Sequence, residues 1–139
     1  MCWAGVGNFL PVEAHIKEHA AWFHRFDVNW TPTVLIFSPE GVERFRIEGY
    51  LPNDEFRAHL ELGLARVAFM KKKWAAAEEI YKGILGHYAQ TNAAAEALYW
   101  AGVSHYKATQ DHTALGFTAQ QFREKYQDSV WAKKASVWG

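Results

Sequence analysis

The chain has 139 residues, of which 50% are hydrophobic and 16% aromatic, with 15 basic and 15 acidic side chains. This balance of charge gives no electrostatic attraction to nucleic acid, so nucleic acid is not expected as a partner. No apolar run approaches the roughly 20 residues that a membrane span needs, and the apolar N-terminus lacks the basic start of a signal peptide, so no membrane insertion is expected.

Residues 10–16 have β character and predict a first strand, and residues 18–28 predict a short helix. The continuous apolar run TVLIF, residues 33–37, is typical of a strand that is covered on both faces. SPEG supplies Pro and Gly for a tight turn, and the alternating residues 42–50 then predict a half-buried strand. Two strands joined by so short a turn should form an antiparallel hairpin.

After Leu51 the chain is predicted to be helical almost to its end. Asn53 or Asp54 is a candidate cap for a helix whose apolar residues recur at spacings of three and four. Further helices are expected over residues 74–87, 93–107 and 113–126, and a last one begins after Ser129, its candidate cap. The short polar loops between them favour antiparallel helical hairpins.

The helical half contains a degenerate repeat, in which residues 65–88 and 98–126 each read as helix, polar turn, helix. Small residues mark close approaches between helices, and aromatic residues fill the space between them. This pattern resembles the tetratricopeptide repeat, although the turn proline of that family is absent. About two units are present, fewer than the three or so that a free-standing array requires, so the helices need support from the N-terminal half.

The N-terminal half resembles the C-terminal part of a thioredoxin-like domain. The matching segments in chain order are FLPVEAHI (9–16), HAAWFHRFDV (19–28), WTPT (30–33), VLIFSPEGVERFRIEGYL (34–51) and PNDEFRAHLELGL (52–64). The resemblance implies that Pro32 has a cis peptide bond, that Thr31 offers backbone edges to a bound peptide, and that Gly49 ends the hairpin. The order of a thioredoxin-like unit and tetratricopeptide-like helices is similar to a known type of bacterial two-part protein.

The sequence departs from this family at its reactive centre, because thioredoxin-like enzymes use a Cys-x-x-Cys pair for thiol–disulfide exchange. Cys2 is the only cysteine, so no disulfide forms within the chain, and a reducing compartment, the cytoplasm, is expected. Cys2 remains a candidate reactive thiol, although no charged neighbour in the sequence would activate it. The family's strand between residues 10–16 and 33–37 is also missing, which predicts an uncovered sheet edge and association with another chain.

Candidate partner-binding residues lie in two places. Trp30, Thr31 and Pro32 form the loop before the hairpin. In the helical half, Tyr99, Trp100 and Tyr106 fit either a peptide groove or the core. Trp131, near the C-terminus, is less easily buried within one chain and is a further candidate for an interface. No metal site is expected, because the histidines near the first strand match no ligand spacing. No cofactor is expected either, since the glycine-containing stretches do not form a phosphate-binding motif.

The sequence therefore predicts an α+β fold, a truncated thioredoxin-like sheet of about three strands (residues 1–66) packed with tetratricopeptide-like helices (residues 67–139). The preferred function is a non-catalytic protein-interaction module or complex subunit, with a protein partner or a second copy in a homodimer. The alternative is a thiol–disulfide redox protein, either one whose N-terminal dithiol segment is missing from this chain or one that uses Cys2 alone.

Overall fold

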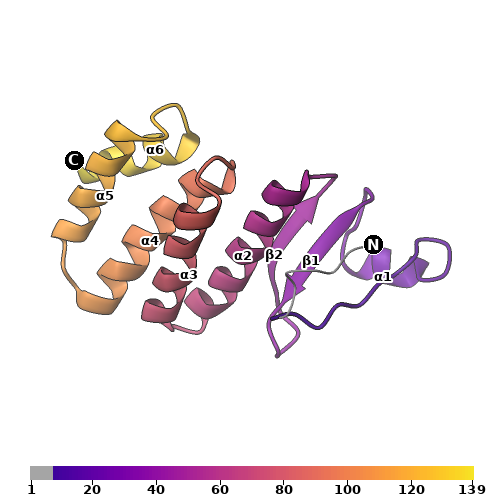
Figure 1. The fold of residues 1–139 in the computed structure, drawn as a ribbon. Helices are drawn as coiled ribbons and strands as arrows, with labels where there is room; N and C mark the ends of the chain where they lie inside the picture. The colour runs from indigo at the N-terminus through magenta and orange to yellow at the C-terminus, as the bar shows by residue number, and fades with distance from the viewer. Residues whose placement is uncertain (1–7) are drawn as a thin grey trace.

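The computed structural model describes residues 8–139. Figure 1 shows a β-hairpin that lies between a short helix and a long helix, with the remaining helices extending away from the long one. The mixed α+β fold expected from the sequence is confirmed. The elements in chain order are α1 (Ala20–Arg25), β1 (Thr33–Phe37), β2 (Glu43–Glu48), α2 (Asn53–Met70), α3 (Trp74–His87), α4 (Ala93–Thr109), α5 (Thr113–Glu124), α6 (Val130–Ala135) and the 3-10 turn η1 (Ser136–Trp138).

The hairpin forms as the sequence predicts, with β1 and β2 antiparallel. The turn between them is closed by the Gly41 N–H, which donates to the Ser38 carbonyl at 2.8 Å. Because side chains alternate between the faces of a strand, one face of the hairpin carries the buried Ile36 and Ile47. These two residues pack with Leu60 of α2 in a small core. The hairpin is therefore fixed to the protein through the face that covers α2.

The expectation of about three strands is wrong for the part of the chain from residue 8 onward, where the sheet has two strands. Residues 10–16 have no strand structure, and Leu10 is 91% exposed. A strand is stable only when a neighbour accepts its backbone hydrogen bonds, and the strand that would lie between residues 10–16 and β1 is absent from this part of the structure. The β character of this segment is therefore not realised.

Helix α2 connects the hairpin to the other helices and packs against both. It begins at Asn53 after Pro52, and neither Asn53 nor Asp54 makes the side-chain cap that was expected. Gly63 permits close packing on the hairpin, because a β-carbon at this position would lie 3.3 Å from the Phe45 β-carbon and even nearer to Ile36. The other side of α2 contributes to the largest core, which it shares with α3 and α4.

Helices α3 to α6 follow the predicted ranges closely and pack in sequence, each beside the next (Figure 1). Ala77, Tyr81 and Ile84 are the buried residues of α3, at the spacing that places them on one helical face. Ser129 caps α6 as predicted, since its hydroxyl oxygen accepts a hydrogen bond from the Ala132 N–H at 3.1 Å. None of the helices described in residues 8–139 is long and apolar enough to cross a membrane.

Candidate functional site

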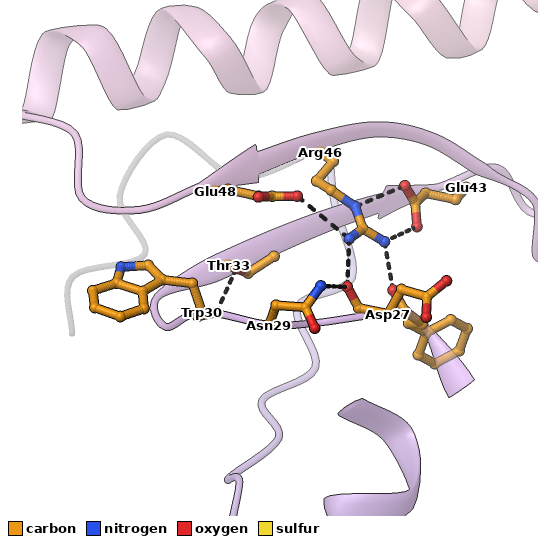
Figure 2. Close-up of polar contacts among 8 residues, drawn as sticks. Asp27, Asn29, Trp30, Thr33, Glu43, Arg46 and Glu48 are labelled. Atoms are coloured by element: carbon orange, nitrogen blue, oxygen red, sulfur yellow. Dashed lines mark hydrogen bonds and ion pairs between the residues drawn. The ribbon is translucent and has the colours of Figure 1, made fainter. Parts of the chain in front are cut away.

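The loop that connects α1 to β1 carries the three candidate residues Trp30, Thr31 and Pro32. The Thr31–Pro32 peptide bond is cis, as the thioredoxin-like resemblance implies. All three residues are exposed, and the Trp30 side chain is 69% accessible. Figure 2 shows the Trp30 ring directed away from the polar contacts that surround the start of the loop. The loop therefore presents an aromatic side chain to solvent beside the edge of the sheet.

Arg46 of β2 holds the beginning of this loop against the hairpin (Figure 2). Its guanidinium donates to the backbone carbonyls of Phe26 at 2.5 Å and Asp27 at 3.0 Å, just after α1 ends. Glu43 accepts two hydrogen bonds from the same guanidinium, at 2.7 and 3.0 Å, and Glu48 lies 3.5 Å away. Two carboxylates of β2 thus orient one arginine, and the arginine binds the main chain that leads to Trp30.

Side chains within the loop add two further contacts. The Thr33 hydroxyl donates to the Trp30 carbonyl at 2.7 Å, and the Asn29 amide donates to the Asp27 carbonyl at 3.2 Å. At the far end the Gly49 N–H donates to the Pro32 carbonyl at 2.7 Å, with Gly49 at a φ of +87° that favours glycine. These contacts tie both ends of the loop to the hairpin, so the position of Trp30 is defined by hydrogen bonds.

Among residues 8–139, β1 pairs with β2 along one edge, and no strand pairs with its other edge. The hydrogen bond between Gly49 and Pro32 makes these two residues a hydrogen-bonded pair, and such pairs alternate along an antiparallel ladder. Thr33 and Leu35 fall at the alternate positions, so their backbone N–H and C=O groups point away from β2. Within residues 8–139, no further strand pairs with β1. A polypeptide strand could therefore add to this edge.

The aromatic candidates of the helical half form a cluster that spans α4, α6 and η1. Tyr99 stacks on Trp138, with ring centroids 4.6 Å apart, and lies 5.2 Å from Trp131 and 5.3 Å from Trp100. All four side chains are half-buried. Tyr106 is not part of this group and lies against His112, at 5.2 Å between centroids. Most of this aromatic surface therefore serves packing within the chain.

The structure brings some of the predicted site residues together and leaves others apart. Trp100 and Trp131 line one cleft, whereas Trp30, Thr31 and Pro32 lie outside it on the loop before β1. Cys2 lies outside the described residues. Over residues 8–139, no three His, Cys, Asp or Glu side chains are grouped so that they could hold a metal ion.

Sequence reasoning missed the role of Arg46, which looked like one of several charges on a half-buried strand. Side chains alternate between the two faces of β2, so Arg46 lies on the face opposite Phe45 and Ile47. This alternation is the only sequence signal for the position of Arg46. Nothing in the sequence indicates that its partners are the carbonyls of residues 26 and 27, because that contact depends on how α1 lies on the hairpin.

Comparison with known families supports the thioredoxin-like part of the prediction. Residues 5–64, just under half of the chain, match the model of a thioredoxin-like domain. Within the described residues this range contains α1, the hairpin and the first two-thirds of α2. A search of curated proteins and a search of solved structures found no match. Residues 5–64 are thus similar to a thioredoxin-like domain, and the helices that follow lie outside the matched range.

Proposed function

We propose that this protein is a non-catalytic protein-interaction module that binds an extended polypeptide segment along the open edge of β1. The observation that carries the proposal is the outward direction of the Thr33 and Leu35 backbone groups, next to the exposed Trp30. Unpaired strand edges accept further strands, and strand addition is a common mode of peptide recognition. Trp30 supplies the apolar contact that backbone pairing alone lacks.

A second copy of the chain is the first partner that we propose. Two β1 strands can pair in antiparallel fashion about a twofold axis, because the same edge then faces itself and both copies make equivalent contacts. The exposed apolar side chains near the N-terminus, Leu10, Val12 and Ile16, add surface that such a contact could cover. The zero net charge of the chain means that two copies do not repel each other strongly.

We further infer that the helical half is a tetratricopeptide-like array that supports the thioredoxin-like unit. We also propose that the protein is bacterial and acts in the cytoplasm. The small residues that the repeat pattern singled out favour this inference, since Ala65 and Ala77 are fully buried and Gly102 lies against Thr118 of the next helix. We also propose a division of the chain into residues 1–66 and 67–139. Position 66 falls within the continuous helix α2, so the two parts would share this helix.

The proposal predicts that Leu35→Pro weakens association at the β1 edge. Proline lacks an N–H and is tolerated where the N–H of an edge strand points outward, so the hairpin should keep its internal hydrogen bonds. Each lost hydrogen bond is worth about 1 kcal/mol, and the ring also obstructs an incoming strand, so we expect dimerisation at least about tenfold weaker. Light scattering after size-exclusion chromatography, over a range of protein concentrations, measures this change.

Phe117→Ala is the matched control, because Phe117 is an exposed aromatic residue of α5, far from β1 in the chain. We expect this variant to associate like the wild type and Trp30→Ala to associate more weakly. A wild-type chain that stays monomeric at millimolar concentration would contradict self-pairing. An unchanged dimer in both Leu35→Pro and Trp30→Ala would show that a different surface is used.

Thiol–disulfide exchange is the second candidate function, and the match to a thioredoxin-like domain is the observation that favours it. With Cys2 as its only cysteine, this 139-residue chain has no internal thiol to resolve a mixed disulfide. An insulin-reduction assay separates the two functions, since a binding module should leave the turbidity at the level of the reductant alone. Turnover that disappears in Cys2→Ser would favour the redox function instead.

A further inference from the structure

A cleft of about 370 Å³ lies where the second strand of the hairpin meets the helices. None of its lining residues comes from β1, so it is distinct from the strand edge of the proposed function. The wall combines charged and aromatic side chains from β2, α2, α4 and α6, among them Arg44, Arg66, Glu96, Trp100 and Trp131. A cleft formed jointly by the sheet and the helices can contact a ligand from several directions.

Arg44 enters this cleft from an irregularity in β2. Ile36 pairs with Phe45 and Phe37 with Glu43, so Arg44 is the extra residue of a β-bulge and has no partner in β1. Bulges of this kind re-aim side chains and are frequent beside functional sites. The Nε of Arg44 is buried and has no hydrogen-bond acceptor among residues 8–139. A buried donor without an acceptor costs free energy, so a ligand that supplies an acceptor to the Arg44 guanidinium would be bound favourably.

Arg66 of α2 provides a second cation in the same wall. Its guanidinium lies over the Trp100 ring, 5.2 Å from the centroid, and 5.9 Å from the centroid of Phe69. Stacking on aromatic rings holds a guanidinium in place without using its hydrogen-bond donors. Neither Arg66 nor Arg44 forms an ion pair with a carboxylate of the described chain. Both arginines thus keep donors for a ligand.

The wall of the cleft has three arginines, Arg44, Arg46 and Arg66, and two acidic side chains, Glu43 and Glu96. Glu43 is engaged by Arg46, with two hydrogen bonds of 2.7 and 3.0 Å. Burial raises the pKa of Glu96, and the nearby charges of His59, Lys134 and Arg66 only partly offset this effect. Lys134 adds a further cation next to Trp131, where its Nζ lies 4.0 Å from the centroid of the Trp131 ring. The local charge therefore favours an anion.

We propose that this cleft binds a carboxylate group that is attached to an apolar moiety. Arg44 and Arg66 would donate to the carboxylate oxygens, because the planar guanidinium matches carboxylate geometry. Trp100 and Trp131 would contact the apolar part. A single negative charge suits two arginines that share the wall with Glu43 and Glu96. The carboxylate can come from the C-terminus of a peptide or from an acidic side chain.

Three short peptides distinguish these sources. Acetyl-Ala-Ala-Phe has a free terminal carboxylate, acetyl-Ala-Ala-Phe-amide has none, and acetyl-Ala-Glu-Phe-amide carries its carboxylate on a side chain. Nitrogen–proton correlation spectra of the full chain report binding through the Arg Nε–H and Trp indole signals. We expect at least one acid to shift the signals of Arg44 and Trp100 and to bind at least about tenfold more tightly than the neutral amide.

Arg44→Gln and Arg66→Gln should each weaken binding of the acid by about tenfold or more, while Arg57→Gln, an exposed position on α2 outside the cleft, should leave it unchanged. The comparison of acid with amide uses the wild-type chain, so it holds even if a variant fails to fold. Equal binding of acid and amide, no shift with either acid at millimolar concentration, or binding that survives both substitutions would overturn the proposal. Leu35→Pro should leave binding in the cleft intact. The strand-edge proposal and the cleft proposal can therefore be disproved independently.

Discussion

At the scale of single residues, Glu96 shows how the cleft affects stability. Burial raises the pKa of its carboxyl above the ordinary value of 4.5. The folded protein therefore holds this proton more tightly than the unfolded chain does. As the pH rises from about 4.5 through the folded-state pKa, the free energy of unfolding decreases, because a buried carboxylate must then be charged.

We predict that Glu96→Gln is more stable than the wild type at neutral pH and that this difference disappears as the pH falls below about 4.5. Glutamine has nearly the same shape and no charge, so it removes the cost of ionisation in this half-buried place. Urea unfolding at a series of pH values measures the effect. Glu79→Gln, at an exposed position of α3, should show no such pH-dependent gain. Parallel profiles for wild type and Glu96→Gln would contradict the prediction.

Residues were predictable from the sequence where their role is local. The cis bond before Pro32 followed from a family resemblance in the short segment WTPT, and the Ser129 cap from its place before an apolar run. Arg44 was not predictable, because the direction of its side chain depends on a bulge that only the pairing of β1 with β2 defines. Arg66 was not predictable as a cleft residue, because Trp100 is far from it in the sequence.

At the scale of elements, the contact between α4 and α5 depends on Gly102. A β-carbon at this position would lie 2.2 Å from the Thr118 hydroxyl oxygen and 2.9 Å from the Thr118 β-carbon. Both residues are buried, so neither helix can yield without losing packing. We predict that Gly102→Ala destabilises the protein by about 1–3 kcal/mol, the usual cost of overpacking a core. Thermal and urea unfolding measure the change.

Gly83→Ala is the control for this prediction, since Gly83 lies inside α3. Apart from its own stretch of helix, no atom of residues 8–139 lies within 4 Å of a β-carbon placed there. Alanine favours the helix by about 0.5–1 kcal/mol over glycine, so this variant should be slightly more stable than the wild type. If both substitutions stabilise the protein, α4 and α5 are not packed as closely as the structure has them.

The helices could be predicted far better than the sheet. A helix satisfies its hydrogen bonds within one segment, so the apolar spacing of α3 and the polar loops around it were sufficient. A strand needs a partner elsewhere in the chain, and for that reason the β pattern of residues 10–16 was misleading. The hairpin was predictable because its partner strands are adjacent in sequence.

At the scale of the whole molecule, α2 is shared by the two halves. Ala58, Leu62 and Ala65 belong to the core with α3 and α4, while Leu60 packs on the hairpin. We predict that a fragment of residues 53–139 unfolds cooperatively and with a higher midpoint than residues 67–139, which lack most of α2. Circular dichroism during thermal unfolding tests this. A fragment 67–139 of equal stability would support a boundary at residue 66.

The loop at Trp30 has a consequence for the energetics of recognition. Arg46 fixes the chain just before the loop, and the Thr33 hydroxyl and Gly49 N–H fix it at the far end. A partner that meets Trp30 encounters a backbone that is already ordered, so little conformational entropy is lost there on association. Selection for tighter contact at this place would thus act mainly on the indole and its immediate neighbours, with the scaffold left as it is.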